Sequence, residues 1–348
     1  MKKISTVVLI LSLAFISGCV LQTSKPVKID GGVFKSNDFG KSWSTKNSIL
    51  NNGEKTGNIG NLEIRFMKFD SNDKDTIYLN SSGQGVYKSA DGGENWQKTT
   101  LTSGTYKSIA INNLNNNVIY VTQGSKISKT VDGMKTWFDT YYEKRPSQNL
   151  VSLIADPFDA SIVYAATTTG IIKSTDYGNT WELLNWKKPQ ILNLYLSNIN
   201  SNTLYAWTNK GLSKSTNAGN DWTDISKGLF KLKKDLRILF INFDPNTEYF
   251  FIGTNMGIYK CTDGGNAWEE IPTLFNFKRV PMVPIVYNKN NLNEVIFSVD
   301  NILYKTIDGG KFWETLKTVP TSRVINYMIS NPSDANIIYL GTKKPQTK

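Results

Sequence analysis

Short apolar runs alternate with clusters of Asn, Asp, Gly and Pro along almost the whole chain, and the runs are rich in β-branched and aromatic residues. This alternation predicts strands separated by turns. A representative stretch contains apolar runs at 150–155, 162–167, 171–174 and 181–184, with turn residues at 156–159 and at Gly170. Runs of this length and spacing predict one four-stranded antiparallel sheet. No segment shows sustained helical periodicity, and only 227–239 is expected to form a short helical turn.

One pattern, an apolar segment followed by Ser/Thr-x-Asp-x-Gly-x-x-Trp, recurs along the chain. The copies are GVFKSNDFGKSW (32–43), GVYKSADGGENW (85–96), KISKTVDGMKTW (126–137), GIIKSTDYGNTW (170–181), GLSKSTNAGNDW (211–222), GIYKCTDGGNAW (257–268) and ILYKTIDGGKFW (302–313). Their final residues, Trp43, Trp96, Trp137, Trp181, Trp222, Trp268 and Trp313, stand 41 to 53 residues apart. This period is typical of β-propeller blades rather than of short solenoid turns.

The two ends of the chain contain complementary halves of one repeat. The first copy lacks the two strands that precede the motif elsewhere, whereas 324–342 contains only those two strands. Joining the halves closes a ring and removes exposed sheet edges. The sequence therefore predicts an all-β fold: a seven-bladed β-propeller of four-stranded antiparallel blades, closed by N- and C-terminal strands that share one blade, in a single domain spanning 32–348.

The repeated motif has the composition of a tight turn. Its Asp carboxylate can accept backbone N–H groups, its Gly tolerates positive φ, and its Trp packs against the sheet. Every blade needs such a turn, whereas a catalytic or metal site is needed once. We therefore interpret the acidic positions as structural: Asp38, Asp91, Asp132, Asp176, Asp263 and Asp308.

Three copies depart from the pattern. Asn217 replaces the Asp of the fifth copy and Met134 replaces the Gly of the third, so these two turns are expected to be irregular. Cys261 replaces the Ser/Thr of the sixth copy and is expected to be a structural, near-isosteric substitute rather than a reactive thiol.

With these motifs, residues 32–342 resemble the BNR/Asp-box propellers, a superfamily that includes sialidases, sortilin ectodomains and photosystem II assembly propellers. The resemblance implies the fold and no particular activity, because one fold hosts many unrelated sites.

The N-terminal segment MKKISTVVLILSLAFISGC has a charged start, a short apolar stretch and small residues before a cysteine. It resembles a bacterial lipoprotein signal, which implies removal of 1–18, lipidation of Cys19 and attachment to a membrane through that lipid. Residues 19–31 are then a lipidated tether. By resemblance to lipoprotein sorting in enteric bacteria, Val20 after the cysteine favours the outer membrane of a Gram-negative envelope, periplasmic or surface-exposed. A Gram-positive surface and ordinary secretion with Cys19 as a bystander stay open.

The amino-acid composition limits the kinds of catalytic and metal site that the chain can form. The chain has no His, which excludes Ser-His-Asp triads, imidazole zinc sites and histidine general bases. With Cys19 lipidated, Cys261 has no partner for an intramolecular disulfide. We predict no catalytic residue, metal or cofactor. The formal net charge of +11 favours anionic partners through screened long-range attraction, and the export signal argues against nucleic acid.

The alternative hypothesis is that the chain is an enzyme, a sialidase-like glycoside hydrolase. Sialidases add to these motifs three arginines for the substrate carboxylate, a Tyr nucleophile paired with Glu, and an acid/base Asp. Four of the five arginines here, Arg65, Arg237, Arg279 and Arg323, precede predicted innermost strands and are expected to gather on one face near the channel. The Arg-Ile-Pro motif of sialidases is missing, sialidases usually have six blades, and xyloglucanase-like enzymes with related repeats use two propellers.

A role in binding a partner explains the residues between the repeated units better than a catalytic role does. The connections between units mix aromatic and basic residues, a combination suited to protein or glycan recognition. We predict a non-catalytic envelope lipoprotein that binds an anionic protein or glycan, with a photosystem II assembly-type role as a further alternative. The candidate partner-binding residues are Arg65, Tyr141, Tyr142, Arg145, Trp186, Lys187, Lys188, Lys233, Lys234, Arg237, Arg279 and Arg323. The Asn- and Gly-rich connection 44–61 is expected to be mobile.

Overall fold

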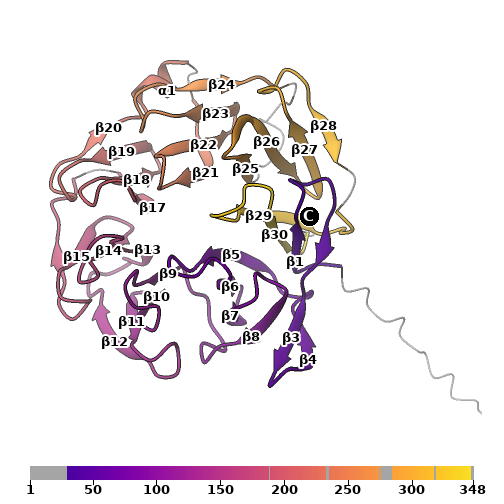
Figure 1. The fold of residues 1–348 in the computed structure, drawn as a ribbon. Coiled ribbons are helices and arrows are strands. Elements are labelled where there is room, and N and C mark those ends of the chain that lie inside the picture. The colour runs from indigo at the N-terminus through magenta and orange to yellow at the C-terminus, as the bar shows by residue number, and fades with distance from the viewer. Residues whose placement is uncertain are drawn as a thin grey trace, which may run out of the picture.

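The computed structural model describes residues 30–187, 189–232, 235–273, 275, 284–316 and 319–345. Its sheets form a ring of seven blades, each built on four antiparallel strands (Figure 1). The predicted all-β, seven-bladed propeller is therefore confirmed. The one described helix, α1 (Lys227–Leu232), lies in the segment expected to form a helical turn. No helix in the described part of the chain is long and apolar enough to cross a membrane.

The first six blades follow one another along the chain. Blade 1 contains β5 (Ile64–Phe69), β6 (Ile77–Ser81), β7 (Gly85–Ser89) and β8 (Asn95–Lys98). Blade 2 contains β9 (Ser108–Ile111), β10 (Ile119–Gln123), β11 (Lys126–Thr130) and β12 (Phe138–Tyr142). Blade 3 contains β13 (Leu150–Ala155), β14 (Val163–Thr167), β15 (Ile171–Ser174) and β16 (Glu182–Leu183).

The later blades repeat this order. Blade 4 contains β17 (Ile191–Leu196), β18 (Leu204–Thr208), β19 (Gly211–Ser215) and β20 (Thr223–Asp224). Blade 5 contains β21 (Ile238–Asp244), β22 (Tyr249–Thr254), β23 (Gly257–Cys261) and β24 (Glu269–Ile271). Blade 6 contains β25 (Ile285–Asn288), β26 (Asn291–Val299), β27 (Ile302–Thr306) and β28 (Glu314–Leu316).

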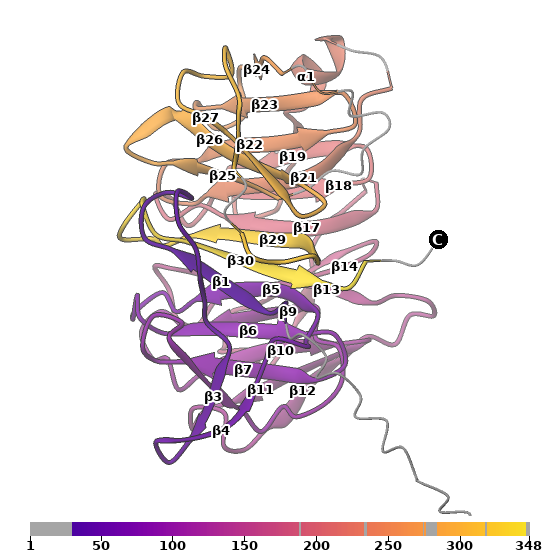
Figure 2. The same ribbon diagram turned by 90° about the vertical axis from the view of Figure 1, so that its right-hand side faces the viewer.

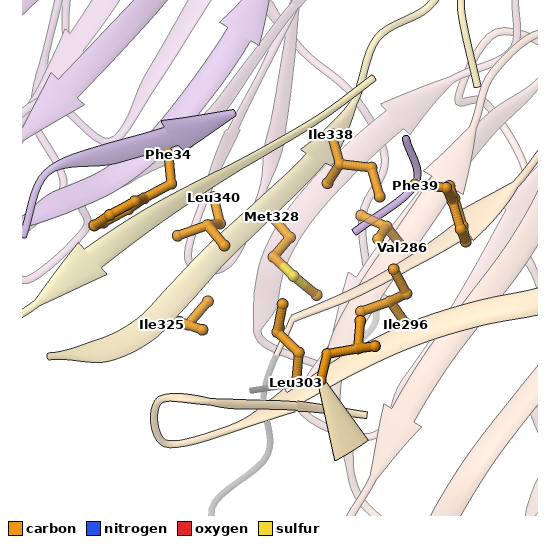
Figure 3. Close-up of a cluster of buried hydrophobic side chains, with 10 residues drawn as sticks. Phe34, Phe39, Val286, Ile296, Leu303, Ile325, Met328, Ile338 and Leu340 are labelled. Carbon is orange, nitrogen blue, oxygen red and sulfur yellow. The ribbon is translucent and has the colours of Figure 1, made fainter. Parts of the chain in front are cut away.

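Blade 7 is assembled from both ends of the chain, as the sequence predicted. Its order is β2-β1-β30-β29, with β29 (Val324–Ser330), β30 (Ile338–Lys343), β1 (Val33–Ser36) and β2 (Ser44–Thr45). Strands β1 and β30 are antiparallel, with Phe34 opposite Leu340. Phe34 and Phe39 from the N-terminal part pack with Met328 and Leu340 from the C-terminal part and with Ile296 of blade 6 (Figure 3). At roughly 1.5–3 kcal/mol for each fully buried side chain, this shared core holds the ring closed.

The ring has two faces, seen edge-on in Figure 2. The first strand of each blade ends at one face, which also contains the repeated motif turns; we name it the turn face. The other face, the connection face, contains described parts of the links between blades, at 99–107, 143–149, 184–187, 225–232, 235–237 and 319–323. Helix α1 and the end of β30 lie on this side (Figure 2).

Every repeated motif forms the same hydrogen-bonded turn on the turn face. In the fourth copy, Ser174 Oγ donates to Asp176 Oδ1 (2.8 Å), and the Gly178 and Thr180 amides donate to Ser174 Oγ (2.7 Å) and Asp176 Oδ1 (2.8 Å). The acidic or amide side chain accepts the same backbone bond in the other copies, at Asp38, Asp91, Asp132, Asn217, Asp263 and Asp308. These bonds are what a structural role requires.

The copies expected to be irregular keep this geometry. Asn217 accepts the Asp221 amide at 2.9 Å, because its Oδ1 replaces one carboxylate oxygen. Met134 adopts the left-handed conformation of the missing Gly, with φ of 74°, and its amide still bonds to Thr130 Oγ1 at 3.1 Å. Burial of the Met134 side chain offsets the cost of this backbone conformation. The expectation of irregular turns is therefore wrong.

Cys261 also preserves the turn. Its Sγ contacts Asp263 Oδ1 at 3.0 Å and accepts the Gly265 amide at 3.0 Å. The side chain is 1% exposed, and burial raises the pKa of the thiol to about 11. A buried, protonated thiol acts as a substitute for Ser, not as a nucleophile.

The motif tryptophans differ in burial. Trp96 is fully buried and donates to the Lys46 carbonyl at 2.7 Å. The others are half-buried: Trp43, Trp137, Trp181, Trp222, Trp268 and Trp313. Trp96 is covered because 44–61 is ordered, contrary to the expectation of mobility. Strands β3 (Ser48–Asn51) and β4 (Glu54–Asn58) form a hairpin, and β3 pairs in parallel with β8.

Sequence reasoning missed a second set of contacts, which joins neighbouring blades. A lysine precedes the Ser/Thr/Cys of every motif, at Lys35, Lys88, Lys129, Lys173, Lys214, Lys260 and Lys305. Lys214 lies over the ring of Tyr205, and both side chains donate to Gly264 O in the turn of the next blade. Lys35 and Tyr339 do the same at Gly92 O. Part of the basic charge is therefore structural.

Candidate functional site

A central channel of about 530 Å³ runs between the innermost strands. Its walls come from β5, β9, β13, β17, β21 and β29, the first strands of their blades. Aromatic side chains line much of it, including Phe66, Phe69, Tyr195, Phe243 and Tyr327. Apolar walls with a few polar groups are typical of ligand-binding cavities.

Most polar groups in the channel wall connect one blade to the next. Ser108 Oγ donates to Leu153 O at 3.3 Å, the Leu194 amide donates to Ser152 Oγ at 3.2 Å, and Tyr327 Oη donates to Met67 O at 2.9 Å. Side chains that hold adjacent blades together are already satisfied, so the wall has few polar groups left for a ligand.

The charged groups of the channel are lysines. Lys68 on β5 donates to Ile109 O at 2.9 Å, and burial lowers its pKa to about 8, so its ammonium remains largely charged at neutral pH. Lys107 is exposed where β9 begins. Among the described residues that line this channel, none is Asp or Glu. The channel therefore offers cations and aromatic surface, and lacks the two carboxylates that glycoside hydrolysis uses.

Two of the candidate arginines are exposed at the connection face. Arg65 lies at the start of β5 and Arg237 immediately before β21, and both are exposed. Lys187 is also exposed, in the link between blades 3 and 4. These cations can meet an incoming partner.

Arg323 does not lie on the surface, contrary to its prediction as a partner-binding residue. It is 8% exposed, its Nε lies 3.5 Å from Asp30 Oδ1, and its Nη2 donates to Asn61 at 3.2 Å. The buried guanidinium is held by a carboxylate from the other end of the chain, so it joins the N-terminal segment to the closing blade.

The Arg145 guanidinium is also largely paired within the chain. Its Nε and Nη2 donate to the two oxygens of Glu143 at 2.9 and 2.6 Å. Hydrogen bonding to Arg145 lowers the pKa of the Glu143 carboxyl to about 2. The pair keeps Glu143 ionised and cancels the charge that Arg145 would otherwise present.

The aromatic candidates also divide into packed and exposed side chains. Trp186 is buried and packs edge-on against Trp222, with ring centroids 5.0 Å apart. Tyr141 packs against Trp181, whereas Tyr142 is 54% exposed. Only Tyr142 of these three offers a free aromatic surface.

Several predicted residues lie outside the described part of the chain: Cys19, Lys188, Lys233, Lys234 and Arg279. Of the four arginines expected to gather near the channel, Arg65 and Arg237 are exposed, Arg323 is buried, and Arg279 is not described.

A second cavity of about 690 Å³ opens at the turn face and shares Phe69 and Phe243 with the channel. Four carboxylates line it: Asp70, Asp73, Asp75 and Asp244. Asp244 is bound by Lys289 at 3.1 Å and by Tyr287 Oη at 3.2 Å. Hydrogen bonding from Thr76 lowers the pKa of Asp73. A general acid needs a raised pKa, so Asp73 is a poor proton donor.

The carboxylates Asp70 and Asp244 belong to a further repeated turn that the sequence analysis missed. The residue at the end of each blade's first strand accepts a backbone amide two positions on: Asp70, Asn112, Asp156, Ser197, Asp244, Asn288 and Asn331. The signal was visible as a short polar residue closing each first apolar run. Among the described residues, no group of His, Cys, Asp and Glu could hold a metal ion.

This arrangement defines a closed, seven-bladed propeller with a cationic channel. No known family model and no curated protein matches the sequence. Solved structures share the fold. A structure of YCF48 bound to D1 peptide is 16% identical, with a TM-score of 0.61 over 82% of this chain and 94% of that one. YCF48 from Cyanidioschyzon merolae is 13% identical, with a TM-score of 0.63 over 81% and 96%.

Enzymes share the same fold. A GH74 xyloglucanase from Xanthomonas campestris is 14% identical, with a TM-score of 0.62 over 89% of this chain. This chain spans 52% of that enzyme, about half its length. At these identities the likeness establishes the propeller and leaves the site to be argued from its own residues.

Proposed function

We propose that this chain is a non-catalytic envelope lipoprotein, a BNR/Asp-box propeller anchored through Cys19, that holds an anionic segment of a protein partner at the connection-face mouth of its channel. The observation that carries the proposal is the channel lining: Lys107 at this mouth, Lys68 nearer the turn-face end, and aromatic walls, without a carboxylate among the described lining residues. An acidic, aromatic-containing segment matches that surface in charge and in apolar character.

Two further observations support a protein partner. Arg65 and Arg237 are exposed where innermost strands begin, so they can extend the cationic surface beyond the channel. The propeller of YCF48, which has the same fold, has been solved bound to D1 peptide. A photosystem II assembly role would be one specialisation of peptide capture, and no described residue favours it over other partners.

The test is binding of a labelled peptide rich in Glu and Tyr, compared with the same peptide carrying Gln for Glu, by fluorescence anisotropy. We expect the acidic peptide to bind more tightly, with affinity falling as salt rises. The variant Arg65→Glu/Lys107→Glu/Arg237→Glu is expected to bind about tenfold or more weakly. Lys74→Glu/Lys135→Glu/Lys311→Glu, on the turn face, makes the same charge change and should bind normally.

Equal binding of both peptides, or equal losses in the two triple variants, would contradict the proposal. Tighter binding of a sulfated or uronic-acid glycan than of the acidic peptide would replace the protein partner with a glycan. Circular dichroism and thermal melting of each variant separate lost binding from lost folding.

Glycoside hydrolysis is the second candidate, favoured by the four carboxylates of the turn-face cavity and by the shared fold of GH74 enzymes. It predicts turnover of xyloglucan or of a fluorogenic sialoside, abolished by Asp73→Asn or Asp75→Asn. We expect no turnover, because the pKa of Asp73 is lowered rather than raised and Asp244 is already bound by Lys289.

A further inference from the structure

The two faces of the ring carry opposite charge. Carboxylates concentrate on the turn face, at Asp38, Asp73, Asp75, Asp91, Asp132, Asp159, Asp176, Asp263, Asp308 and Asp334. Hydrogen bonds within the turns hold the pKa of several of them, such as Asp132 and Asp308, below the usual value, so they are ionised at neutral pH. The turn face also contains exposed lysines, at Lys41, Lys74, Lys135 and Lys311, but its carboxylates outnumber them, so it is the acidic side of the molecule.

The connection face is the basic side. Exposed cations lie on links and hairpin turns of successive blades, at Lys144, Lys187, Lys210, Lys227 and Lys344. Exposed carboxylates on the described links and hairpin turns of this face are fewer, at Asp235 and Asp300. The anions Asp30 and Glu143 are already paired with Arg323 and Arg145. A molecule with this asymmetry orients in the field of a charged surface.

The N-terminal part of the chain joins the propeller at the basic face. Asp30, the first described residue, accepts the Ser322 amide at 3.0 Å and pairs with the buried Arg323, in the link between blades 6 and 7. Gly32 and Thr342, near the end of β30, are also hydrogen-bonded, with the Gly32 amide donating to Thr342 Oγ1 at 2.8 Å. The chain before residue 30 is therefore attached to the connection face, not to the turn face.

The length of that chain limits how far the propeller can lie from an anchor. From Cys19 to Asp30 there are eleven peptide steps, which span at most about 40 Å when fully extended. A lipid at Cys19, which is part of the proposed function, would therefore keep the basic face near the bilayer. The acidic face would point away from it.

We infer that the connection face is a membrane-binding surface, which docks on anionic lipid headgroups through its rim of lysines. These lysines, Lys144, Lys210, Lys227 and Lys344, differ from the partner-binding residues of the proposed function, so the two activities can be separated. Each lysine near an anionic membrane contributes roughly fivefold in partitioning. A partner captured at the channel mouth would then come from a protein at the same membrane.

The test uses a chain beginning at Val20, without the lipid; every strand of the ring lies in 30–345, so this removal leaves all blades intact. Co-sedimentation is measured with vesicles rich in phosphatidylglycerol and with vesicles of phosphatidylcholine alone. We expect binding to the anionic vesicles, little binding to the neutral ones, and release at high salt.

Two variants with the same change in net charge test which face binds the membrane. Lys144→Glu/Lys210→Glu/Lys227→Glu/Lys344→Glu, on the connection face, is expected to lose at least about a hundredfold in partitioning. Lys41→Glu/Lys74→Glu/Lys135→Glu/Lys311→Glu makes the same change in net charge with exposed lysines of the turn face, and should keep most of the binding. Both variants should bind the acidic peptide, because the channel residues are unchanged.

Equal losses in the two quadruple variants, or equal binding to anionic and neutral vesicles, would overturn the inference. Peptide binding without any vesicle binding would also overturn it and would leave the proposed function standing. Vesicle binding without peptide binding would support the inference and remove the proposed function.

Discussion

The two faces of this propeller are built differently. On the turn face, each blade repeats the same bonds: a Ser, Thr or Cys contacts an Asp or Asn, which accepts a backbone amide. On the connection face, the links differ in length and in amino-acid sequence. Their ion pairs, such as Arg145–Glu143 and Arg323–Asp30, each occur in one link and do not repeat from blade to blade. Repeated contacts serve the fold, which every blade needs, whereas a surface that differs from blade to blade can recognise a partner.

The largest effect is expected from opening the ring that carries both faces. Deleting 324–348 eliminates β29 and β30, so β1 loses its pairing with β30 and the cluster containing Phe34, Met328 and Leu340 is broken. We expect an aggregated or unfolded product, because the open ring exposes sheet edges. Size-exclusion chromatography and thermal melting provide the measurement, and a truncated chain that melts like the full one would contradict the closed ring.

The next prediction tests whether copies on the turn face are equivalent. Trp96→Ala removes a fully buried indole and should cost about 3–5 kcal/mol in the free energy of unfolding. Trp137→Ala removes a half-buried one and should cost roughly 1–2 kcal/mol, because less area leaves water. Urea unfolding measures both. Equal costs would show that the hairpin of β3 and β4 does not protect Trp96.

A third prediction separates structure from recognition among the arginines of the connection face. Arg323→Met breaks a buried contact with Asp30 and should cost about 2 kcal/mol, less than the 3–5 kcal/mol of a fully buried pair. Arg65→Met, at an exposed position, should change stability by less than about 0.5 kcal/mol and weaken peptide binding. The reverse pattern would mean that Arg323 recognises the partner and Arg65 supports the fold.

Acid should weaken the repeated turns of the turn face. The pKa of the Asp176 carboxyl is lowered to about 2 by the Thr180 and Ser174 bonds, and the pKa values of Asp91 and Asp308 are also lowered. Because these folded-state values lie below those of the unfolded chain, near 3.9, their stabilisation is complete above that pH and is lost as the pH falls toward 2. Thermal melting between pH 5 and pH 2 measures the loss.

The natural control for acid sensitivity is Asn217, which forms the same turn without a carboxylate. Asp176→Asn should therefore fold at neutral pH and show a shallower loss of melting temperature below pH 4. An unchanged acid profile in variants of several motif aspartates would exclude these carboxylates as the cause.

The smallest effect is expected at Cys261. Cys261→Ser restores the residue type of the other copies and should change the free energy of unfolding by less than about 1 kcal/mol. The native thiol should be unreactive toward a disulfide reagent at pH 8, because it is buried and its pKa is raised to about 11. Rapid modification of the folded protein would show that the turn around Cys261 opens.

Much of the fold could be predicted because its signals are local and repeated. The strand 150–155 was predicted with its observed bounds, and the shared blade followed from counting strands at the two ends. The two substitutions expected to disturb turns did not, because Asn217 retains an acceptor oxygen and the side chain of Met134 is buried. The hairpin at 44–61 escaped prediction because β3 pairs with β8, which lies far along the chain.

The sequence by itself determined the ring, its closure and its turns, since those depend on residues a few positions apart and on a period that repeats. The tertiary structure decided which charges remain available. Arg323 is buried because Asp30 reaches it from the other end of the chain, and Lys35 and Lys214 are used between blades. Arg65 and Arg237 stay exposed. Pairing of this kind depends on which distant segments meet in space, which local spacing along a chain does not encode.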